Sequence, residues 1–225
     1  MKQYFTILSQ ERLVSSSLLP ALLLATGLSL LLLACSGKSN SGKSSGSADI
    51  PTEYCDELVK LAEDGNVEAQ SNLARLYYIG EGVAQSYLKA YKWLLKAAEQ
   101  GNAESQLHLG FLYDHGLDVT QSYIEAYKWF RKAAEQGNAT AQYNLGTYYY
   151  CGRGVTQSYT EAYKWFRKAA EQGYAPAQYN VYACYWNGQG VAQSKSESMD
   201  WLVKSAEQGY QVAIKTLEGI KERNQ

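Results

Sequence analysis

The chain has 225 residues, of which 46% are hydrophobic and 19% are charged, and its formal net charge is −1. This balance is typical of an ordinary globular protein and excludes both the basic surface of a nucleic-acid-binding domain and the charge excess of an acidic tail. With 20 tyrosines and 3 prolines, the composition favours packed helices over strands.

Residues 1–34 have the pattern of a signal peptide, with Lys2 and Arg12 in a polar first part followed by a leucine-rich apolar run. The sequence Leu-Leu-Ala-Cys at 32–35 resembles the bacterial lipobox. The resemblance implies that a diacylglyceryl group is attached to Cys35 and that the chain is cleaved before it. Ser36 at the next position implies an outer membrane lipoprotein that faces the periplasm. An uncleaved signal anchor is the alternative, and it would leave the folded part on the same side of the membrane.

Residues 35–53 are predicted to form a lipidated, flexible tether. The segment SGKSNSGKSSGSADI at 36–50 is built mainly from serine, glycine and lysine, so it has little apolar surface to bury. A chain of about 15 such residues reaches roughly 20 Å. We therefore expect the folded part to lie close to the membrane that holds the lipid.

Residues 54–225 repeat every 36 residues without a gap. One column of glycines and one of tryptophans mark the period: Gly65, Gly101, Gly137, Gly173 and Gly209, and Trp93, Trp129, Trp165 and Trp201. A period of this length predicts a solenoid of four helix pairs. Residues 54–64 match only the second helix of a pair, which predicts an N-terminal half-repeat. Residues 210–225 become charged, as expected of a C-terminal cap.

The ends of the two helices in each pair can be read from the sequence. The first helix, called helix A, is predicted at 138–152 in the third pair, between Gly137 and Gly152. Pro176 falls in the first turn of the last helix A, where its missing N–H does no harm. The second helix, called helix B, follows a Ser-x-x-Glu pattern that begins at Ser122, Ser158 and Ser194. These patterns predict capping boxes, in which the hydroxyl and the carboxylate both satisfy free N–H groups.

These columns resemble the Sel1-like repeat, a relative of the tetratricopeptide repeat. The third pair shows the pattern best, at Ala141, Leu145, Gly146, Tyr149, Gly152, Gly154, Val155, Ala162, Trp165, Lys168, Ala169, Ala170 and Gly173. The resemblance implies an all-α fold, a right-handed α-solenoid. Two departures concern local geometry: Asp118 replaces a loop glycine, and Tyr182 replaces a small residue of helix A.

The variation between repeats suggests where a partner binds. Residues 119–137 and 155–173 differ only at Ile124 and Thr160, whereas the helices A differ at most positions outside the core. The resemblance implies that helix A lines the concave face. Asparagine amides suit the clamping of a peptide backbone, and aromatic rings give stiff contact area. The predicted partner-binding residues are Asn72, Arg75, Tyr78, His108, Phe111, Asp114, Tyr143, Asn144, Thr147, Tyr150, Tyr179, Asn180 and Trp186. Alternatively, the asparagines bond neighbouring helices and the aromatic residues fill the core.

No catalytic residue, metal site or cofactor is predicted. His108 and His115, with Asp114, supply too few ligands for a zinc site. Ser86 and Lys89 fit the S-x-x-K motif of penicillin-recognising enzymes, but Ser86 occupies the cap column of helix B and the partner motifs of that family are missing. A weak β-lactam-binding enzyme remains an alternative.

The chain has four cysteines. With Cys35 lipidated, the other three cannot all pair in an oxidising compartment. Cys151 and Cys184 lie on helices A of adjacent repeats and can form a disulfide, which would leave Cys55 buried or free.

Together these features predict a membrane-anchored periplasmic module that binds a protein and no nucleic acid. Sel1-repeat lipoproteins that this sequence resembles are commonly encoded beside secreted antibacterial lipases of the type VI system. The resemblance thus implies an immunity protein that binds and neutralises a phospholipase or lipase effector. The alternative is an envelope adaptor for secretion or cell-wall enzymes.

Overall fold

The computed structural model describes residues 52–223. The predicted signal peptide, Cys35 and the tether up to residue 51 lie outside these residues. The described residues all belong to one compact unit. The first helix begins at Thr52, so the last two residues of the predicted tether are helical.

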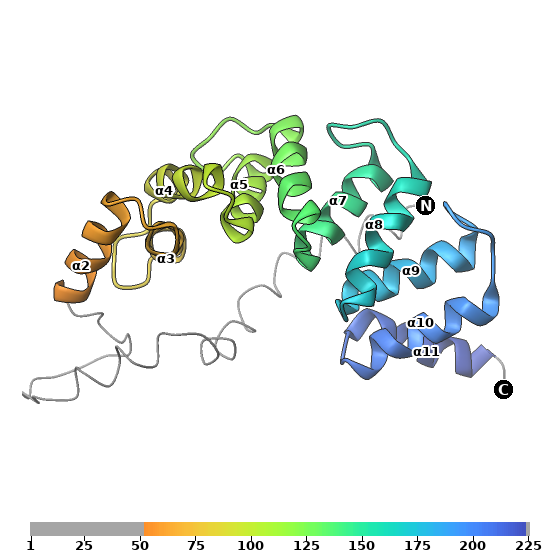
Figure 1. Cartoon of the computed structure of the whole chain (residues 1–225). Helices are drawn as coiled ribbons and strands as arrows, with labels where there is room; N and C mark the ends of the chain where they lie inside the picture. Colours follow the sequence, from red (N-terminus) through yellow and green to blue (C-terminus); the bar gives the residue numbers. More distant parts are fainter. Residues whose placement is uncertain (1–51, 224–225) are drawn as a thin grey trace, which may run out of the picture. The chain divides into compact units, whose positions relative to one another are not determined.

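Ten α-helices and no strands make up residues 52–223 (Figure 1). Their bounds are α2 Thr52–Glu63, α3 Val67–Ile79, α4 Tyr87–Glu99, α5 Ala103–His115, α6 Tyr123–Glu135, α7 Ala139–Cys151, α8 Tyr159–Glu171, α9 Ala175–Asn187, α10 Lys195–Glu207 and α11 Gln211–Arg223.

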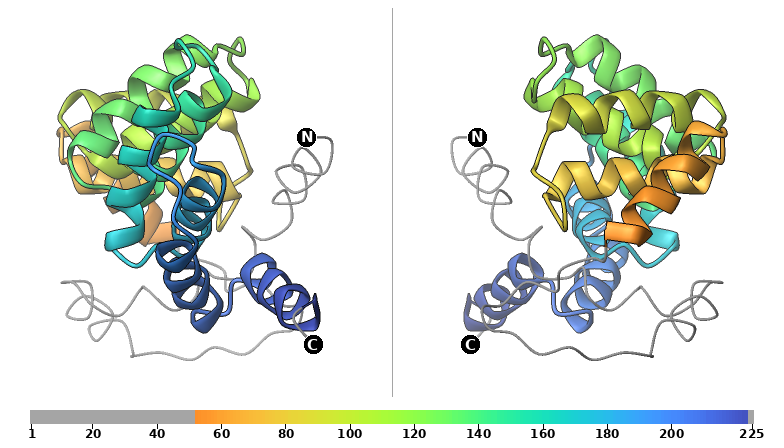
Figure 2. Two further views of the ribbon diagram at one scale, coloured as in Figure 1. Left: turned by 90° about the vertical axis from the view of Figure 1, so that its right-hand side faces the viewer. Right: turned by 90° about the vertical axis from the view of Figure 1, so that its left-hand side faces the viewer.

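The helices alternate between the two predicted types. Helices A are α3, α5, α7 and α9, and helices B are α4, α6, α8 and α10, while α2 and α11 are the predicted half-repeat and cap. Each helix packs against its neighbours in the chain, and both side views in Figure 2 show successive helices side by side. The prediction of an all-α solenoid is confirmed.

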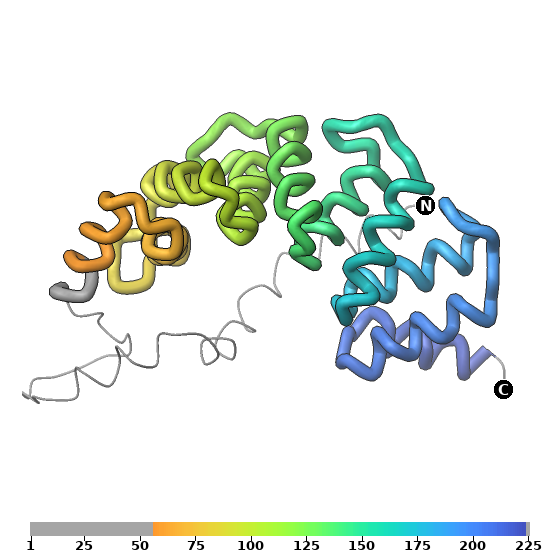
Figure 3. The backbone as a smooth tube through the Cα atoms, viewed as in Figure 1, coloured from red at the N-terminus to blue at the C-terminus, as the bar shows by residue number. Residues whose placement is uncertain are grey.

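The connections also repeat. The turn from helix B to the next helix A is tight, and the connection from helix A to helix B is longer, as the tube in Figure 3 shows. Helix α7 ends at Cys151 and is capped by Gly152, whose φ of 69° lies in the left-handed region that glycine tolerates. Helix α7 begins after Asn138, which caps it: the Asn138 side-chain oxygen accepts a hydrogen bond from the Ala141 N–H at 2.8 Å. This cap was not predicted from the sequence. Pro176 lies in the first turn of α9, as predicted.

The caps of helix B are only half as predicted. The Ser122 hydroxyl accepts a bond from the Glu125 N–H at 3.3 Å, and the serines of the other three helices B act in the same way. The reciprocal bond is absent from the described residues, because the Ser122 N–H donates to the Tyr113 carbonyl at 2.9 Å. The Glu125 carboxylate pairs with Lys128 instead, at 2.6 Å. The capping-box prediction was therefore wrong for the carboxylate.

Asp118 performs a capping role that the sequence did not reveal. It is the one non-glycine residue with a positive φ among residues 52–223, at 54°. Its carboxylate accepts a bond from the Leu88 N–H, in the first turn of α4, at 3.2 Å. In that helix Lys89 stands where α6, α8 and α10 have glutamate, so α4 has no acidic residue of its own in the first turn. Asp118 supplies the missing negative charge from the next repeat.

Small and large residues are matched across each helix pair. A Cβ atom on Gly146 would lie 2.6 Å from the Phe166 ring, and the same holds at Gly110 against Phe130, at 2.4 Å. The first pair instead combines Ala74 with Leu94. In the fourth pair Tyr182 is buried and packs in one cluster with Leu202. The departure at Tyr182 is therefore accommodated by the smaller aliphatic partner.

Four glutamine pairs cross-link the stack. The Gln142 side-chain amide donates to the Ala134 carbonyl of the preceding helix B at 3.2 Å, and its oxygen accepts from Gln172 at 2.7 Å. We call each such set a glutamine rung; the others join Gln100 to Gln70, Gln136 to Gln106, and Gln208 to Gln178. Buried polar groups are costly unless they are bonded, and the rungs satisfy this requirement in every repeat.

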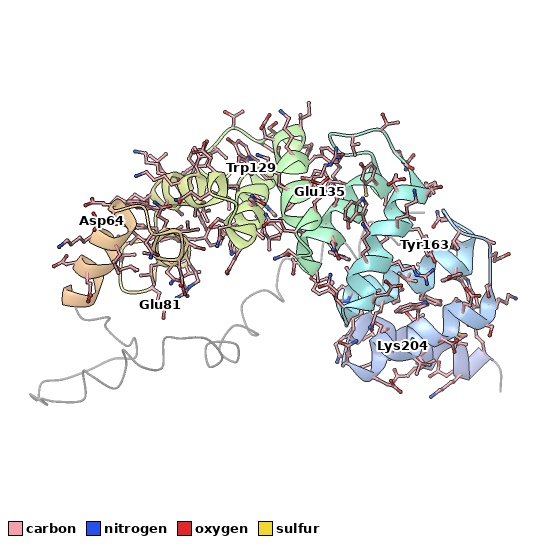
Figure 4. The ribbon with its side chains drawn as sticks, in the orientation of Figure 1. Asp64, Glu81, Trp129, Glu135, Tyr163 and Lys204 are labelled. Atoms are coloured by element: carbon pink, nitrogen blue, oxygen red, sulfur yellow. The ribbon has the colours of Figure 1, made fainter. Side chains whose placement is uncertain are left out.

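Aromatic contacts repeat with the same period. The Tyr163 and Tyr185 hydroxyls lie 2.9 Å apart and join α8 to α9. On helix B, the Lys132 ammonium lies 4.1 Å from the centre of the Trp129 ring, and the other three helices B have the same pair. Figure 4 labels Trp129 and Tyr163 among the side chains. None of the helices within residues 52–223 has the length and apolar content needed to cross a membrane.

Candidate functional site

The varied positions of helix A form the candidate site. We define the helix A face as the half-buried side chains at the sixth, ninth and twelfth residues of each helix A. They are Asn72, Arg75 and Tyr78 in α3, His108, Phe111 and Asp114 in α5, Asn144, Thr147 and Tyr150 in α7, and Asn180, Ala183 and Trp186 in α9. All these side chains retain some exposure, which a binding face requires.

The fifth residue of helix A contributes less to this face than predicted. Tyr143 is only 8% exposed, and its ring packs 5.9 Å from Phe166 and 5.3 Å from Tyr174 between centres. Its placement on an exposed face was therefore wrong, because the ring fills space between repeats. Tyr179 is half-buried, and its hydroxyl lies 3.4 Å from the Thr216 hydroxyl of α11.

Aromatic rings connect the first two repeats along the helix A face. The Tyr78 ring lies 5.5 Å from the His108 ring, which lies 6.4 Å from Phe111. Burial raises the pKa of Tyr78, and the nearby Tyr87 adds to this effect. The Nδ1 atom of His108 is buried and has no hydrogen-bond partner in residues 52–223. These rings give a continuous, stiff contact surface over α3 and α5.

Charged groups lie at the edge of this aromatic surface. Arg75 pairs with Glu81 at 3.2 Å. Interaction with His108, whose Nε2 lies 3.9 Å from the carboxylate, lowers the pKa of Glu104, and Arg75 acts in the same direction. The edge therefore carries the Arg75–Glu81 ion pair and the Glu104 carboxylate beside His108.

Asp114 has a structural partner rather than an open carboxylate. It accepts a hydrogen bond from the Tyr148 hydroxyl of the next repeat, and it lies 3.6 Å from His115. Burial, followed by this hydrogen bond, raises the pKa of Tyr148. The predicted groove residue therefore joins α5 to α7. The bond between Tyr148 and Asp114 was not predicted from the sequence, although Tyr148 occupies the column of the buried residues Leu76 and Leu112.

The three asparagines of the face differ in their bonds. Asn144 donates to the Thr140 carbonyl of its own helix at 2.8 Å, and Thr147 donates to the Tyr143 carbonyl at 3.1 Å. The side chains of Asn72 and Asn180, unlike that of Asn144, form no hydrogen bond with another residue in 52–223. The alternative that the asparagines bond neighbouring helices is thus not seen. Asn72 and Asn180 are the two amides best placed to bond a peptide backbone.

The C-terminal part of the face continues across the last two repeats. The Tyr150 hydroxyl donates to the Gln189 side-chain oxygen at 3.2 Å. The Trp186 ring lies 5.9 Å from the Tyr182 ring. Trp186 also borders a depression of about 610 Å³ near the C-terminal end of the solenoid.

The two cysteines do not form the disulfide considered from the sequence, since both are free. Cys184 is buried in the core column of Leu76 and Leu112, whereas Cys151 is the last residue of α7 and is half-buried. Burial raises the pKa of Cys184 to about 12 and also raises that of Cys151. Both thiols are therefore protonated at neutral pH.

The serine that fits a catalytic motif in the sequence has a structural role. The Ser86 hydroxyl accepts a bond from the Lys89 N–H at 3.3 Å and caps α4, as the alignment of the repeats indicated. In the part of the chain that the structure describes, no group of three or more histidine, cysteine, aspartate or glutamate side chains could hold a metal ion.

Comparison with known proteins agrees with the period of the structure. Four consecutive segments match the Sel1 repeat, at residues 67–102, 103–138, 139–174 and 175–210. Each segment begins at the first residue of a helix A. No curated protein matches the chain.

Solved structures of similar chains come from several bacteria. A protective antigen of uropathogenic Escherichia coli with an SLR fold is 37% identical with a TM-score of 0.67, over 69% of this chain and 33% of that one. The chain thus spans about a third of that protein. A Sel1 repeat protein from Oxalobacter formigenes is 33% identical with a TM-score of 0.71, over 80% of this chain and 70% of that one. An immunity protein from Pseudomonas aeruginosa is 25% identical with a TM-score of 0.48, over 75% of this chain and 62% of that one.

Proposed function

Since the chain belongs to the Sel1 repeat family and is a protein-binding module, we propose that it binds a single protein partner along the helix A face. One observation carries the proposal. The helix A face combines stiff aromatic side chains with two amides, Asn72 and Asn180, that form no hydrogen bond within residues 52–223. Amides can both donate to and accept from an extended backbone, and rigid rings lose little entropy on binding. The repeated helix B and the rungs hold this face in place.

We further propose that the solenoid is tethered to the outer membrane through a lipid on Cys35 and faces the periplasm. The lipobox-like sequence at 32–35 and the serine-rich segment after it support this location. Several acyl chains anchor a protein firmly, because each buried methylene contributes roughly 0.8 kcal/mol. Labelling of cells with an alkyne-bearing fatty acid should mark the protein, and Cys35→Ala should abolish both the label and the membrane fractionation. Unchanged labelling of that variant would refute the lipid anchor.

The partner we propose is a secreted antibacterial lipase of the type VI system, which the protein neutralises at the membrane. The likeness of the sequence to Sel1-repeat lipoproteins encoded beside such lipases supports this choice. The near-identity of residues 119–137 and 155–173 also supports it, since it indicates recent duplication, as expected of a protein that competes with changing toxins. The second candidate is an adaptor for envelope enzymes.

Capture of partners separates the two candidates. Residues 47–225, which form their own compact unit, are immobilised and offered an extract of secreted and envelope proteins, and the bound proteins are identified by mass spectrometry. One dominant lipase supports the immunity role, and a set of envelope or cell-wall proteins supports the adaptor. As a matched control, Arg131→Ala changes an exposed charge of helix B and should leave capture unchanged.

Inhibition then tests the immunity role directly. The captured lipase is assayed on phospholipid vesicles with increasing amounts of the solenoid. Hydrolysis should stop near one solenoid per lipase, because occlusion is stoichiometric. Tight binding without loss of hydrolysis would exclude neutralisation while leaving protein binding intact.

A further inference from the structure

The C-terminal depression is a second candidate site, separate in its lining from most of the helix A face. It has a volume of about 610 Å³ and lies between α9, α10 and α11. Its lining consists of Tyr182, Trp186, Lys195, Met199, Ile220 and Arg223. The volume falls in the range of about 300–1,000 Å³ that is typical of small-ligand sites.

The fourth repeat has lysine at a position where the other three repeats have tyrosine. The first residue of helix B is tyrosine in the first three pairs and Lys195 in the fourth. In the third pair, the Tyr159 ring packs 5.1 Å from Tyr150 of helix A. The residue equivalent to Tyr150 is Trp186, which has the Lys195 ammonium 5.8 Å from its ring centre. A flexible, charged side chain has therefore replaced a ring at this position.

A second tyrosine is also replaced in the fourth pair. Tyr163 of the third pair bonds Tyr185 through its hydroxyl, at 2.9 Å, and the equivalent residue of α10 is Met199. Methionine is flexible and polarisable, so it adapts to varied apolar groups. Together with Ile220 of α11, Met199 gives the depression an apolar part without hydrogen-bonding groups.

Two cations complete the lining. Lys195 and Arg223 come from different helices and are exposed. Neither forms an ion pair with another residue in 52–223. The depression thus combines an apolar surface with two positive charges that a ligand can neutralise.

We propose that this depression binds the C-terminal end of a partner polypeptide. The terminal carboxylate lies between Lys195 and Arg223, and the last side chain, which is apolar, packs on Met199 and Ile220. A C-terminal residue carries its carboxylate and its side chain on the same carbon atom, so both groups fit in one depression of this size. An internal acidic residue would need an apolar neighbour and a sharp backbone turn to place the same two groups. The proposal extends beyond the helix A face and holds for any protein partner with such an end.

Short peptides test the proposal on residues 47–225. The probe is acetyl-Gly-Gly-Gly-Phe with a free carboxylate, and its affinity is measured by isothermal titration. The same peptide as a C-terminal amide should bind about tenfold more weakly, because removing one partner of a charge pair leaves the other unpaired. Acetyl-Gly-Phe-Asp-Gly amide represents an internal acidic segment and should also bind weakly.

Variants locate the binding in the depression. Lys195→Tyr restores the residue of the first three repeats, so it should abolish peptide binding while the unfolding midpoint stays the same or rises. Arg223→Ala should weaken binding about tenfold for the reason given for the amide. Lys204→Ala is the matched control, since Lys204 lies on the same helix but over Trp201, and it should leave affinity unchanged.

Several results would overturn the proposal. These are equal binding of acid and amide, stronger binding of the internal acidic peptide, or full binding by Lys195→Tyr. Affinity that is present only after deletion of residues 224–225 would mean that the chain's own end fills the depression, and it too would overturn the proposal. Capture of a partner along the helix A face is measured separately, so the failure of one proposal does not decide the other.

Discussion

The side-chain amide of Gln100 donates a 2.8 Å hydrogen bond to the side-chain oxygen of Gln70, which lies buried 30 positions earlier in the chain. The Gln70 amide in turn donates to the Ala62 carbonyl at 2.9 Å. One rung therefore ties together α2, α3 and the C-terminal cap of α4, without any contribution from the apolar core.

Removal of one rung should destabilise the solenoid. Gln142→Leu leaves the Gln172 amide without its acceptor and removes the bond to the Ala134 carbonyl. The expected loss in the free energy of unfolding is about 1–3 kcal/mol, measured by urea titration of residues 47–225. Gln211→Leu is the control and should cost less than about 0.5 kcal/mol, because Gln211 is exposed. A loss at Gln142 no larger than the control would show that the rungs add nothing to stability.

Gly146→Ala should destabilise the third repeat by steric conflict. The added methyl group would lie 2.6 Å from the Phe166 ring, so the expected cost is about 1–3 kcal/mol. The first repeat combines Ala74 with Leu94, so the double variant Gly146→Ala with Phe166→Leu should be more stable than the sum of its two single variants predicts. Thermal unfolding of the four proteins measures this coupling. Gly219→Ala has open space around it and should not destabilise α11. Strict additivity of the two changes would contradict the size-matching argument.

Asp118 should be separable into a strain contribution and a bonding contribution. Asp118→Gly removes the bond to the Leu88 N–H but suits the φ of 54°. Asp118→Ala removes the bond and keeps an unfavourable left-handed backbone, so it should be about 1 kcal/mol less stable than the glycine variant. Adding Lys89→Glu to Asp118→Gly should restore stability by placing a carboxylate within α4 itself. If Lys89→Glu has no effect in that background, the capping role of Asp118 is wrong.

The cysteines should respond to pH and to reagents in a defined order. Burial raises the pKa of Cys184 from an ordinary value of 9.0 to about 12, so folding favours the protonated thiol. Its contribution to stability is present in full below pH 9 and is lost as the pH rises towards 12. Cys184→Val should therefore lose less stability than the native chain between about pH 7 and pH 11.

Alkylation checks the same assignment independently. Iodoacetamide should modify Cys151 before Cys184, because Cys151 is half-buried and Cys184 is buried. A reducing agent should leave the intact mass of the protein unchanged, because Cys151 and Cys184 are both free. A mass increase of two hydrogens on reduction, lost in Cys151→Ser, would show a disulfide.

The helix A face should depend on particular asparagines for partner binding. Asn72→Ala and Asn180→Ala should each weaken capture of the partner by about fivefold, as a lost interface hydrogen bond of roughly 1 kcal/mol would do. Asn144→Ala should have a smaller effect, because its amide already bonds the Thr140 carbonyl. Affinities are compared with the helical circular dichroism signal of each variant. Equal effects at all three positions would indicate that the face acts through shape alone.

The repeat period allowed the fold to be predicted from the sequence. Glycine at the end of each helix A and serine before each helix B mark boundaries that depend on local conformation, and the structure has them within one or two residues. The asparagine caps, such as Asn138, were not predicted, although an asparagine directly before a helix is a common cap and Asn138 bonds the Ala141 N–H three residues later. The buried glutamines also had a signal: a polar residue in an unchanged column of helix A, at the positions of Gln70, Gln106, Gln142 and Gln178.

Contacts between repeats were harder to predict. The Ser122 N–H bonds the Tyr113 carbonyl rather than the Glu125 carboxylate, which depends on how the connection folds back on helix A. Tyr143 shares a column with Ser71, Leu107 and Tyr179, so no periodic pattern showed its burial. Asp114 and Tyr148 are 34 positions apart, and only the packing of α5 on α7 brings them together.

The constant register of the rungs has a consequence for how such a chain can change in length. Every rung uses the same positions of its repeat, so inserting or deleting one unit of 36 residues, as unequal recombination of the gene would do, leaves each remaining glutamine opposite a partner. The array can therefore gain or lose repeats without new core residues. Its recognition face would lengthen or shorten by one helix each time. A change in the number of repeats would therefore allow the array to bind a variant partner.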